Sequence, residues 1–99
     1  MKHYLKTWPE PFDAVRGGAK RHEVRVNDRG FHEGDAVALV EWDPILKACT
    51  GRVMHATIGH VSTGAGPWGL PDFLCVFTLL DVRTDLDEAR RREAVSKIS

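Results

Sequence analysis

The sequence predicts a small α+β domain built on a mixed, partly open β-barrel of about five or six strands. Short apolar or alternating segments are separated by Gly, Pro, Asn and Asp, which is typical of strands joined by turns. One short stretch near the N-terminus reads as a helix between strands. The 99 residues, 42% hydrophobic and 28% charged, are ordinary for one soluble globular domain.

The N-terminal part is expected to hold a strand and a short helix. Residues 3 to 6 read as a strand, which Trp8-Pro9-Glu10-Pro11 ends because proline lacks the backbone donor of a strand ladder. Pro11 to Arg16 reads as a two-turn helix with Phe12 and Val15 on one side and two glycines after it. A helix this short persists only if it packs against the sheet.

The segment His22-Glu23-Val24-Arg25-Val26 alternates and is expected to be the next strand. A period of two places Val24 and Val26 on one face and Glu23 and Arg25 on the other. We expect the valines to face the core and the two charged residues to form a polar face.

Turns and three further strands are expected after it. Asp28 and Asp35 lie in turn sequences, where Asp bonds nearby backbone, and we interpret both as turn residues. The apolar run from Ala36 to Trp42 predicts a buried strand, and Arg52 to Val61 is expected to pair with it as a hairpin. Phe73 to Val82 reads as a long central strand that completes the barrel.

The segment from Ser62 to Pro71 is too rich in Gly and Pro for regular structure, and it contains an aromatic residue, Trp68, that a mere spacer would not need. It is interpreted either as a functional loop or as a cap, in which Trp68 and Leu70 close one end of the barrel. The sequence alone does not separate these two interpretations.

Residues 1–83 are expected to form the domain, and residues 84–99 a charged C-terminal tail or helix. Asp85 and Glu88 have the spacing of a capping box, which favours a helix. The apolar residues after them form no continuous stripe, so a frayed tail is an equal alternative.

Composition and charge limit the classes of function. The net charge is zero, which argues against indiscriminate nucleic-acid binding, but residues 1–30 carry seven Lys or Arg against four Asp or Glu. One end of the domain is therefore expected to be basic. No run approaches the roughly 18 apolar residues of a membrane span, and no secretory signal is evident, so a cytoplasmic location without membrane contact is expected.

The cysteine and histidine pattern predicts no metal site and no cofactor. Cys49 and Cys75 are far apart in a chain without a signal peptide and are expected to be reduced thiols, with a disulfide as the alternative. His55 and His60 lack a nearby Cys pair and are interpreted as strand residues.

The most informative cluster consists of Lys20, Glu23 and Arg25. Strand alternation points Glu23 and Arg25 the same way, and Lys20 lies in the turn that leads into this strand. A mixed-sign cluster of this kind can be a salt-bridge network that only satisfies itself. The alternative is a binding site.

A resemblance favours the binding site. Gly18-Ala19-Lys20-Arg21-His22-Glu23-Val24-Arg25 resembles the Gly-x-Lys-x-x-Glu-x-Arg signature of the ASCH superfamily, whose fold is similar to the PUA domain. Over roughly residues 3 to 81 the chain is similar to a compact ASCH/PUA-like family of unknown function from bacterial and phage genomes. The further matching motifs are Lys6-Thr7-Trp8-Pro9-Glu10, Phe12-Asp13-Ala14-Val15, Asn27-Asp28-Arg29, Phe31, Gly34-Asp35, Glu41-Trp42-Asp43-Pro44, Thr50-Gly51-Arg52 and Gly69-Leu70.

The resemblance implies a cleft beside the first helix that binds RNA, a nucleotide or a modified nucleoside. Arg25 offers a planar fork for a phosphate or guanine, Lys20 a compact charge, and Glu23 an acceptor for an exocyclic amine. Trp8 and Trp68 are expected either to stack on bases or simply to pack. The candidate binding residues are Lys20, Arg25, Glu23, Trp8, Lys6, Arg21, His22, Arg29 and Trp68.

Two other classes stay open. Some superfamily relatives hydrolyse acetylated cytidine, but they carry a threonine nucleophile where this chain has Glu23; an enzyme here would use Lys20 and Glu23 as catalytic residues. A ribonuclease would need Glu23 to meet Glu41 or Asp43. A protein-interaction adaptor is the third class, and the oligomeric state is not predicted.

Overall fold

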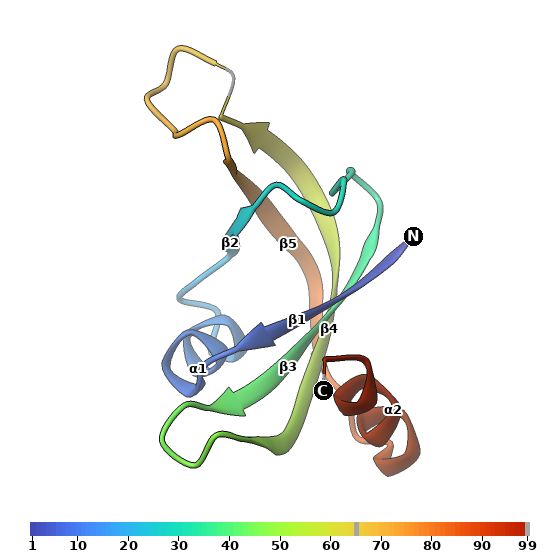
Figure 1. Cartoon of the computed structure of the whole chain (residues 1–99). Coiled ribbons are helices and arrows are strands. Elements are labelled where there is room, and N and C mark those ends of the chain that lie inside the picture. The colour runs from blue at the N-terminus through green and yellow to red at the C-terminus, as the bar shows by residue number, and fades with distance from the viewer. Residues whose placement is uncertain (65, 99) are drawn as a thin grey trace.

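The computed structural model describes residues 1–64 and 66–98, so Ala65 in the Gly-rich loop and Ser99 in the tail lie outside the described residues. Within this part the chain forms five strands and two helices: β1 (Lys2–Thr7), α1 (Pro9–Arg16), β2 (His22–Val26), β3 (Ala36–Asp43), β4 (Ala48–Thr63), β5 (Leu74–Thr84) and α2 (Glu88–Ile98). The strands make one sheet that curls into a half-barrel (Figure 1). The predicted α+β class is confirmed.

The strand order places β1 and β2 at the two edges of the sheet. The order is β1-β3-β4-β5-β2, with β1 parallel to β3 and every other neighbouring pair antiparallel. β1 and β2 are consecutive strands, and α1 connects one edge to the other (Figure 1). The centre of the sheet is β4. The strand after residue 73 is an interior strand, as predicted, since β5 lies between β4 and the edge strand β2.

The curl of the sheet follows from irregular pairing of the two longest strands. The register between β4 and β5 shifts between His55 and Thr57 and again between Ile58 and Val61. Such bulges bend a strand and increase its twist. One half of β4 therefore pairs with β3 while its other half turns away, carrying β5 and β2 with it.

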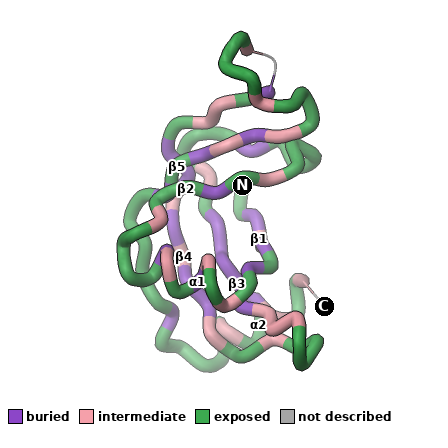
Figure 2. Tube along the Cα trace, turned by 90° about the vertical axis from the view of Figure 1, so that its left-hand side faces the viewer, coloured by how far each residue is buried: buried purple, intermediate pink, exposed green. Residues whose placement is uncertain are grey.

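Each helix covers a different face of the sheet. The main core fills the concave face, where Phe12 and Val15 of α1 are buried as predicted. On the opposite face Ala94 of α2 packs against β3 and β4 (Figure 2). The main core consists of Leu5, Phe12, Val15, Phe31, Val37, Leu39, Met54, Ala56, Ile58, Cys75, Phe77 and Leu79.

The orientation predicted for β2 is wrong. Val24 and Val26 are 48% and 51% exposed, whereas Glu23 on the other face is only 4% exposed. A period of two separates the faces but does not say which face is inside. The concave side of β2 accepts a carboxylate because two cations pair with it, as described below, and the valines stay on the uncovered side.

Both helices differ from prediction in their first turn. α1 begins at Pro9, two residues earlier than expected, because proline at the first helical position loses no hydrogen bond. At α2 the cap is Asp87, whose Oδ1 accepts the backbone N–H of Arg90 at 3.0 Å. Asp85, the expected cap, instead binds His55 at 2.6 Å. The tail forms a docked helix as far as Ile98; the division at residue 83 stays a prediction.

Cys49 and Cys75 are free thiols, and His55 and His60 both lie on β4. Burial raises the pKa of the Cys75 thiol. In residues 1–64 and 66–98, neither helix is long and apolar enough to cross a membrane.

Arg52 of β4 joins α1 to the sheet. Its guanidinium donates to both carboxylate oxygens of Glu41 on β3, at 2.7 and 2.6 Å, and to Asp13 of α1 at 2.9 Å. It also lies over the ring of Phe12, 4.7 Å from the centroid. Glu41 is buried, and its hydrogen bonds from Arg52 hold the pKa of its carboxyl below the usual range. Arg52 and Glu41 thus form a bidentate ion pair, in which each oxygen of the buried carboxylate accepts a hydrogen bond from the guanidinium.

We predict that Arg52→Met lowers the free energy of unfolding by about 3 kcal/mol, because it leaves the Glu41 carboxylate buried and without a cation. Arg16→Met is the matched control: Arg16 pairs with Asp13 in solvent at 3.6 Å, and its loss should cost less than about 0.5 kcal/mol. The double variant Glu41→Met with Arg52→Met should recover most of the loss. Urea unfolding measures all three, and equal costs for the two single variants would contradict the assignment.

Candidate functional site

Glu23, Lys20 and Arg25 form one connected ion-pair network on the concave face. Lys20 Nζ donates to Glu23 Oε1 at 3.0 Å, and Arg25 Nε donates to Glu23 Oε2 at 3.1 Å. Lys20 also donates to the backbone oxygen of His22 at 2.7 Å. The Glu23 side chain is 5% exposed, while those of Lys20 and Arg25 are about one quarter exposed. Each carboxylate oxygen therefore has its own cation, which is what a buried charge requires.

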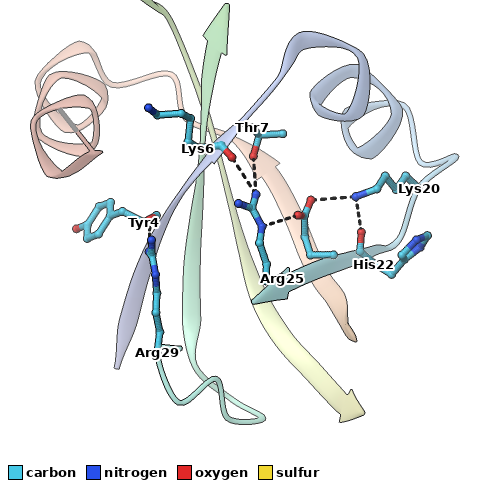
Figure 3. Close-up of polar contacts among 8 residues, drawn as sticks. Tyr4, Lys6, Thr7, Lys20, His22, Arg25 and Arg29 are labelled. Atoms are coloured by element: carbon cyan, nitrogen blue, oxygen red, sulfur yellow. Dashed lines mark hydrogen bonds and ion pairs between the residues drawn. The ribbon is translucent and has the colours of Figure 1, made fainter. Parts of the chain in front are cut away.

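Arg25 also joins the two edges of the sheet. Its Nη2 donates to the backbone oxygen of Lys6 at 2.9 Å and to Thr7 Oγ1 at 3.4 Å, both on β1. Arg29, just after β2, repeats the pattern, because its Nη1 donates to the backbone oxygen of Tyr4 at 2.8 Å. Figure 3 shows both guanidinium groups reaching β1. Side chains thus bridge the gap that no strand ladder closes.

The guanidinium of Arg25 keeps unused donors. Arginine carries five N–H donors, and Glu23 and β1 engage those of Nε and Nη2. In the described part of the chain, Nη1 has no acceptor within hydrogen-bond distance. Arg25 is therefore fixed on one side and able to donate two hydrogen bonds on the other.

A hollow of about 320 Å³ lies in the gap between the two edges. We call it the edge hollow. The rings of Phe31 and His3 lie 4.7 Å apart, and those of Phe31 and Phe77 4.9 Å, so Phe31 is fixed from two sides. Apolar and charged groups thus share a small site. The edge hollow is lined by Leu5, Val24, Arg25, Val26, Asp28, Arg29, Phe31 and Leu74.

The backbone of β2 adds polar groups to this gap. Arg21 and Asn27 bond to β5, through the contacts Leu79 N–H to Arg21 O at 2.9 Å and Asn27 N–H to Phe73 O at 2.8 Å. In an antiparallel pair, successive residues direct their backbone N–H and C=O alternately toward the partner strand and away from it. Val24 is three positions from both Arg21 and Asn27, so its N–H and C=O point away from β5, to the free edge. One donor and one acceptor therefore stand beside Arg25.

The remaining predicted residues are not gathered at this hollow. The ammonium of Lys6 points away from Arg25 and lies over the Trp42 ring, 4.5 Å from its centroid (Figure 3). Arg21 Nε donates to the backbone oxygen of Gly18 at 3.2 Å, and the His22 side chain is exposed. The basic residues of the N-terminal third are thus divided between the two faces of the sheet.

The two tryptophans lie apart. Trp8 precedes α1 and is 57% exposed. Trp68 is 60% exposed, and its Nε1 donates to the backbone oxygen of Thr63 at 2.9 Å, which pins the loop to the end of β4. The β4–β5 loop that carries Trp68 lies at the opposite end of the molecule from α1 (Figures 1 and 2). One ligand the size of a nucleotide does not reach both.

Both carboxylate oxygens of Glu23 bind cations and its side chain is only 5% exposed, so little of the carboxylate is accessible to the water or substrate on which a general base would act. Glu41, the second carboxylate of a metal-dependent nuclease, is held in the Arg52 network instead. Among the described residues no three His, Cys, Asp or Glu side chains come together as a metal site.

A larger hollow of about 600 Å³ lies between α2 and the start of β4. Its arginines are already engaged: Arg52 by Glu41 and Asp13, Arg92 by Glu88 at 2.6 Å, and Arg91 by the backbone oxygen of Asp85 at 3.1 Å. Size alone therefore does not make it the better binding site.

Sequence reasoning missed the part of the site that β1 supplies. Leu5 and Thr7 share the inward face of β1, and alternation alone indicates that they point the same way. Nothing local indicates that β1 and β2 face each other across a gap. Phe31 follows the turn at Gly30, and nothing in the sequence around it indicates that it is buried in the main core.

The chain matches the family described as Domain of unknown function (DUF3850) over residues 2–79. It is also similar to a protein of Escherichia phage P2 described as "Uncharacterized 12.9 kDa protein in GpA 3'region". The two are 36% identical over 78 residues, which make up 79% of this chain and 68% of the phage protein. The matched region includes every residue of the edge hollow.

One prediction concerns acid stability near Phe31. Asp35 bonds His3 at 2.8 Å and the backbone N–H of His32 at 3.1 Å. These contacts, above all the one with His3, lower the pKa of Asp35 from 3.8 to about 2. A depressed pKa stabilises the fold above the unfolded value, and this stabilisation is lost as pH falls toward 2.

We expect the stability advantage of the parent over Asp35→Asn to be constant above about pH 5 and to shrink steadily between pH 5 and 2. Urea unfolding of both proteins across this range measures the difference. Two curves that stay parallel down to pH 2 would show that Asp35 does not titrate with the proposed shift.

Proposed function

The chain belongs to the family described as Domain of unknown function (DUF3850), and we propose that it is a small RNA- or nucleotide-binding module that takes an unpaired nucleotide in the edge hollow. The observation that carries the proposal is Arg25, which is fixed by Glu23 and β1 and retains the two N–H groups of Nη1 beside an apolar surface. A planar fork of this kind pairs with a phosphate or with the O6 and N7 edge of guanine.

The shape and chemistry of the edge hollow support this occupant. A volume of about 320 Å³ lies at the lower end of the range for small-molecule sites, roughly 300 to 1,000 Å³. Leu5 and Phe31 offer apolar contact to a base, while Arg25 and Arg29 offer positive charge. Asp28 and the backbone N–H and C=O of Val24 can pair with polar groups on a base edge.

The arrangement also supports a finer assignment of the fold as PUA-like and of the chain as a relative of the ASCH superfamily. The half-barrel carries α1 beside the gap between its edges, where a PUA-like cleft is expected. Lys20, Glu23 and Arg25, which carry the resemblance, converge there. In this proposal Arg25 contacts the ligand, and Glu23 and Lys20 position Arg25.

Arg25→Gln is expected to weaken binding of a short single-stranded oligoribonucleotide at least tenfold, because it removes a charge and the donors of Nη1. Arg16→Gln, the same change on the exposed side of α1, should alter affinity less than twofold. The slope of log affinity against log salt should become shallower by about 0.7 for Arg25→Gln and stay unchanged for Arg16→Gln. Fluorescence anisotropy across a salt series measures both quantities.

Arg29→Gln is the second test variant and should weaken binding severalfold. Both substitutions also remove a contact with β1, so the melting temperature of each variant is measured, and a loss of affinity supports the proposal where the variant is folded at the assay temperature. Oligodeoxyribonucleotides and free nucleoside monophosphates identify the preferred ligand. Unchanged affinity in both variants, or no binding of any of these ligands at low salt, would overturn the proposal and favour a protein-binding role.

A further inference from the structure

A second cluster of charges lies on the face of the sheet that α2 covers. It surrounds a hollow of about 220 Å³, which we call the α2 hollow. The lining residues come from the start of β1, from β4, from the end of β5 and from the first turns of α2. They are Lys2, His55, Arg83, Thr84, Asp85 and Arg90.

Asp85 and His55 form a buried pair at the base of this cluster. Asp85 Oδ2 lies 2.6 Å from His55 Nε2, and its other oxygen accepts the backbone N–H of Asp87 at 2.8 Å and lies 3.4 Å from Arg90 Nε. The Asp85 side chain is fully buried and that of His55 is 13% exposed. The carboxylate of Asp85 fixes the orientation of the His55 ring through Nε2, so Nδ1 is the ring nitrogen that Asp85 does not engage.

Asp85 is charged despite its burial. Burial alone would raise the pKa of its carboxyl, but the hydrogen bonds from His55 and Asp87, with the charge of Arg90, bring the pKa below its ordinary value. One negative charge is therefore shared between His55 and Arg90.

Two further cations at the α2 hollow have no acidic partner. Lys2 Nζ lies over the Tyr4 ring, 5.3 Å from its centroid, and Arg83 Nη1 donates to the backbone oxygen of Asp81 at 3.0 Å. In the described part of the chain, neither Lys2 nor Arg83 forms an ion pair. The hollow thus carries three cationic side chains against one carboxylate, and the excess charge is positive.

We propose that the α2 hollow binds a phosphate group. A tetrahedral dianion would neutralise the excess charge, with an ammonium, two guanidinium groups and the Thr84 hydroxyl as donors. Sites for drug-sized molecules have volumes of roughly 300 Å³ or more. The α2 hollow, at about 220 Å³, is smaller, so it suits one phosphate rather than a whole nucleotide. Inorganic phosphate and the terminal phosphate of an oligonucleotide share this chemistry.

This site is separate from the edge hollow. The two have no lining residue in common. On β1, Lys2 belongs to the outward series and Leu5 to the inward series, so the two hollows lie on opposite faces of the strand. The phosphate site therefore goes beyond the proposed function and stands without it.

The test is a titration of the full chain with inorganic phosphate, followed by amide chemical shifts, against sodium chloride at equal ionic strength. We expect saturable shifts centred on His55, Arg83, Thr84 and Asp85 with phosphate and not with chloride. The double variant Lys2→Gln with Arg83→Gln should bind phosphate at least tenfold more weakly. Its control, Arg16→Gln with Lys47→Gln, has the same net charge and should bind within twofold of the parent.

A short oligoribonucleotide with and without a 5′-phosphate identifies the source of the phosphate. If the phosphorylated oligonucleotide binds at the same amides more tightly than the unphosphorylated one, the ligand is a terminal phosphate. If inorganic phosphate binds there as tightly as the phosphorylated oligonucleotide, the ligand is the free ion. Arg25→Gln should leave phosphate binding at the α2 hollow unchanged, so a failure here is distinct from a failure at the edge hollow. Shifts that do not saturate, or equal affinities for the two double variants, would overturn the proposal.

Discussion

The carboxylate of Glu23 is the constraint on which the candidate site depends. It sits on the concave face of an edge strand, where a buried charge persists only if both of its oxygens are paired. Lys20 and Arg25 supply that pairing from the preceding turn and from two residues along the strand. Because Arg25 is held by Glu23, its guanidinium reaches the backbone of β1 and links two sheet edges that have no ladder between them.

The topology explains why charges gather at this gap. A curled sheet that stays open has two free edges, whose backbone groups need partners. Here the chain passes from one edge to the other through α1, so residues after the helix face residues before it. Arg25 and Arg29 satisfy carbonyl oxygens of β1 while one guanidinium keeps donors for a ligand. The other face of the sheet is organised separately, by α2 and the pair of Asp85 and His55.

The sequence predicted the element types and the convergence of Lys20, Glu23 and Arg25, because both follow from local periodicity. It did not predict which face of β2 is inside: two valines are a stronger apolar signal than one glutamate, and only the positions of Lys20 and β1 reverse that preference. The central place of β4 depends on the pairing of β1 with β3 and of β2 with β5, and the partnership of Asp85 with His55 joins residues 30 apart, so no local pattern encodes either. The division of the basic residues between two faces follows from strand alternation, which places Lys6 on the outward face of β1, over Trp42.

The most direct test of the account is a map of amide and arginine side-chain shifts while a short oligoribonucleotide is added to the full chain. We expect shifts at Leu5, residues 24–29 and Phe31, together with the Nη resonances of Arg25, and little change at Lys47, which lies in the turn between β3 and β4. Shifts confined to the convex face of β2 and β5, with the Arg25 resonances unmoved, would contradict it.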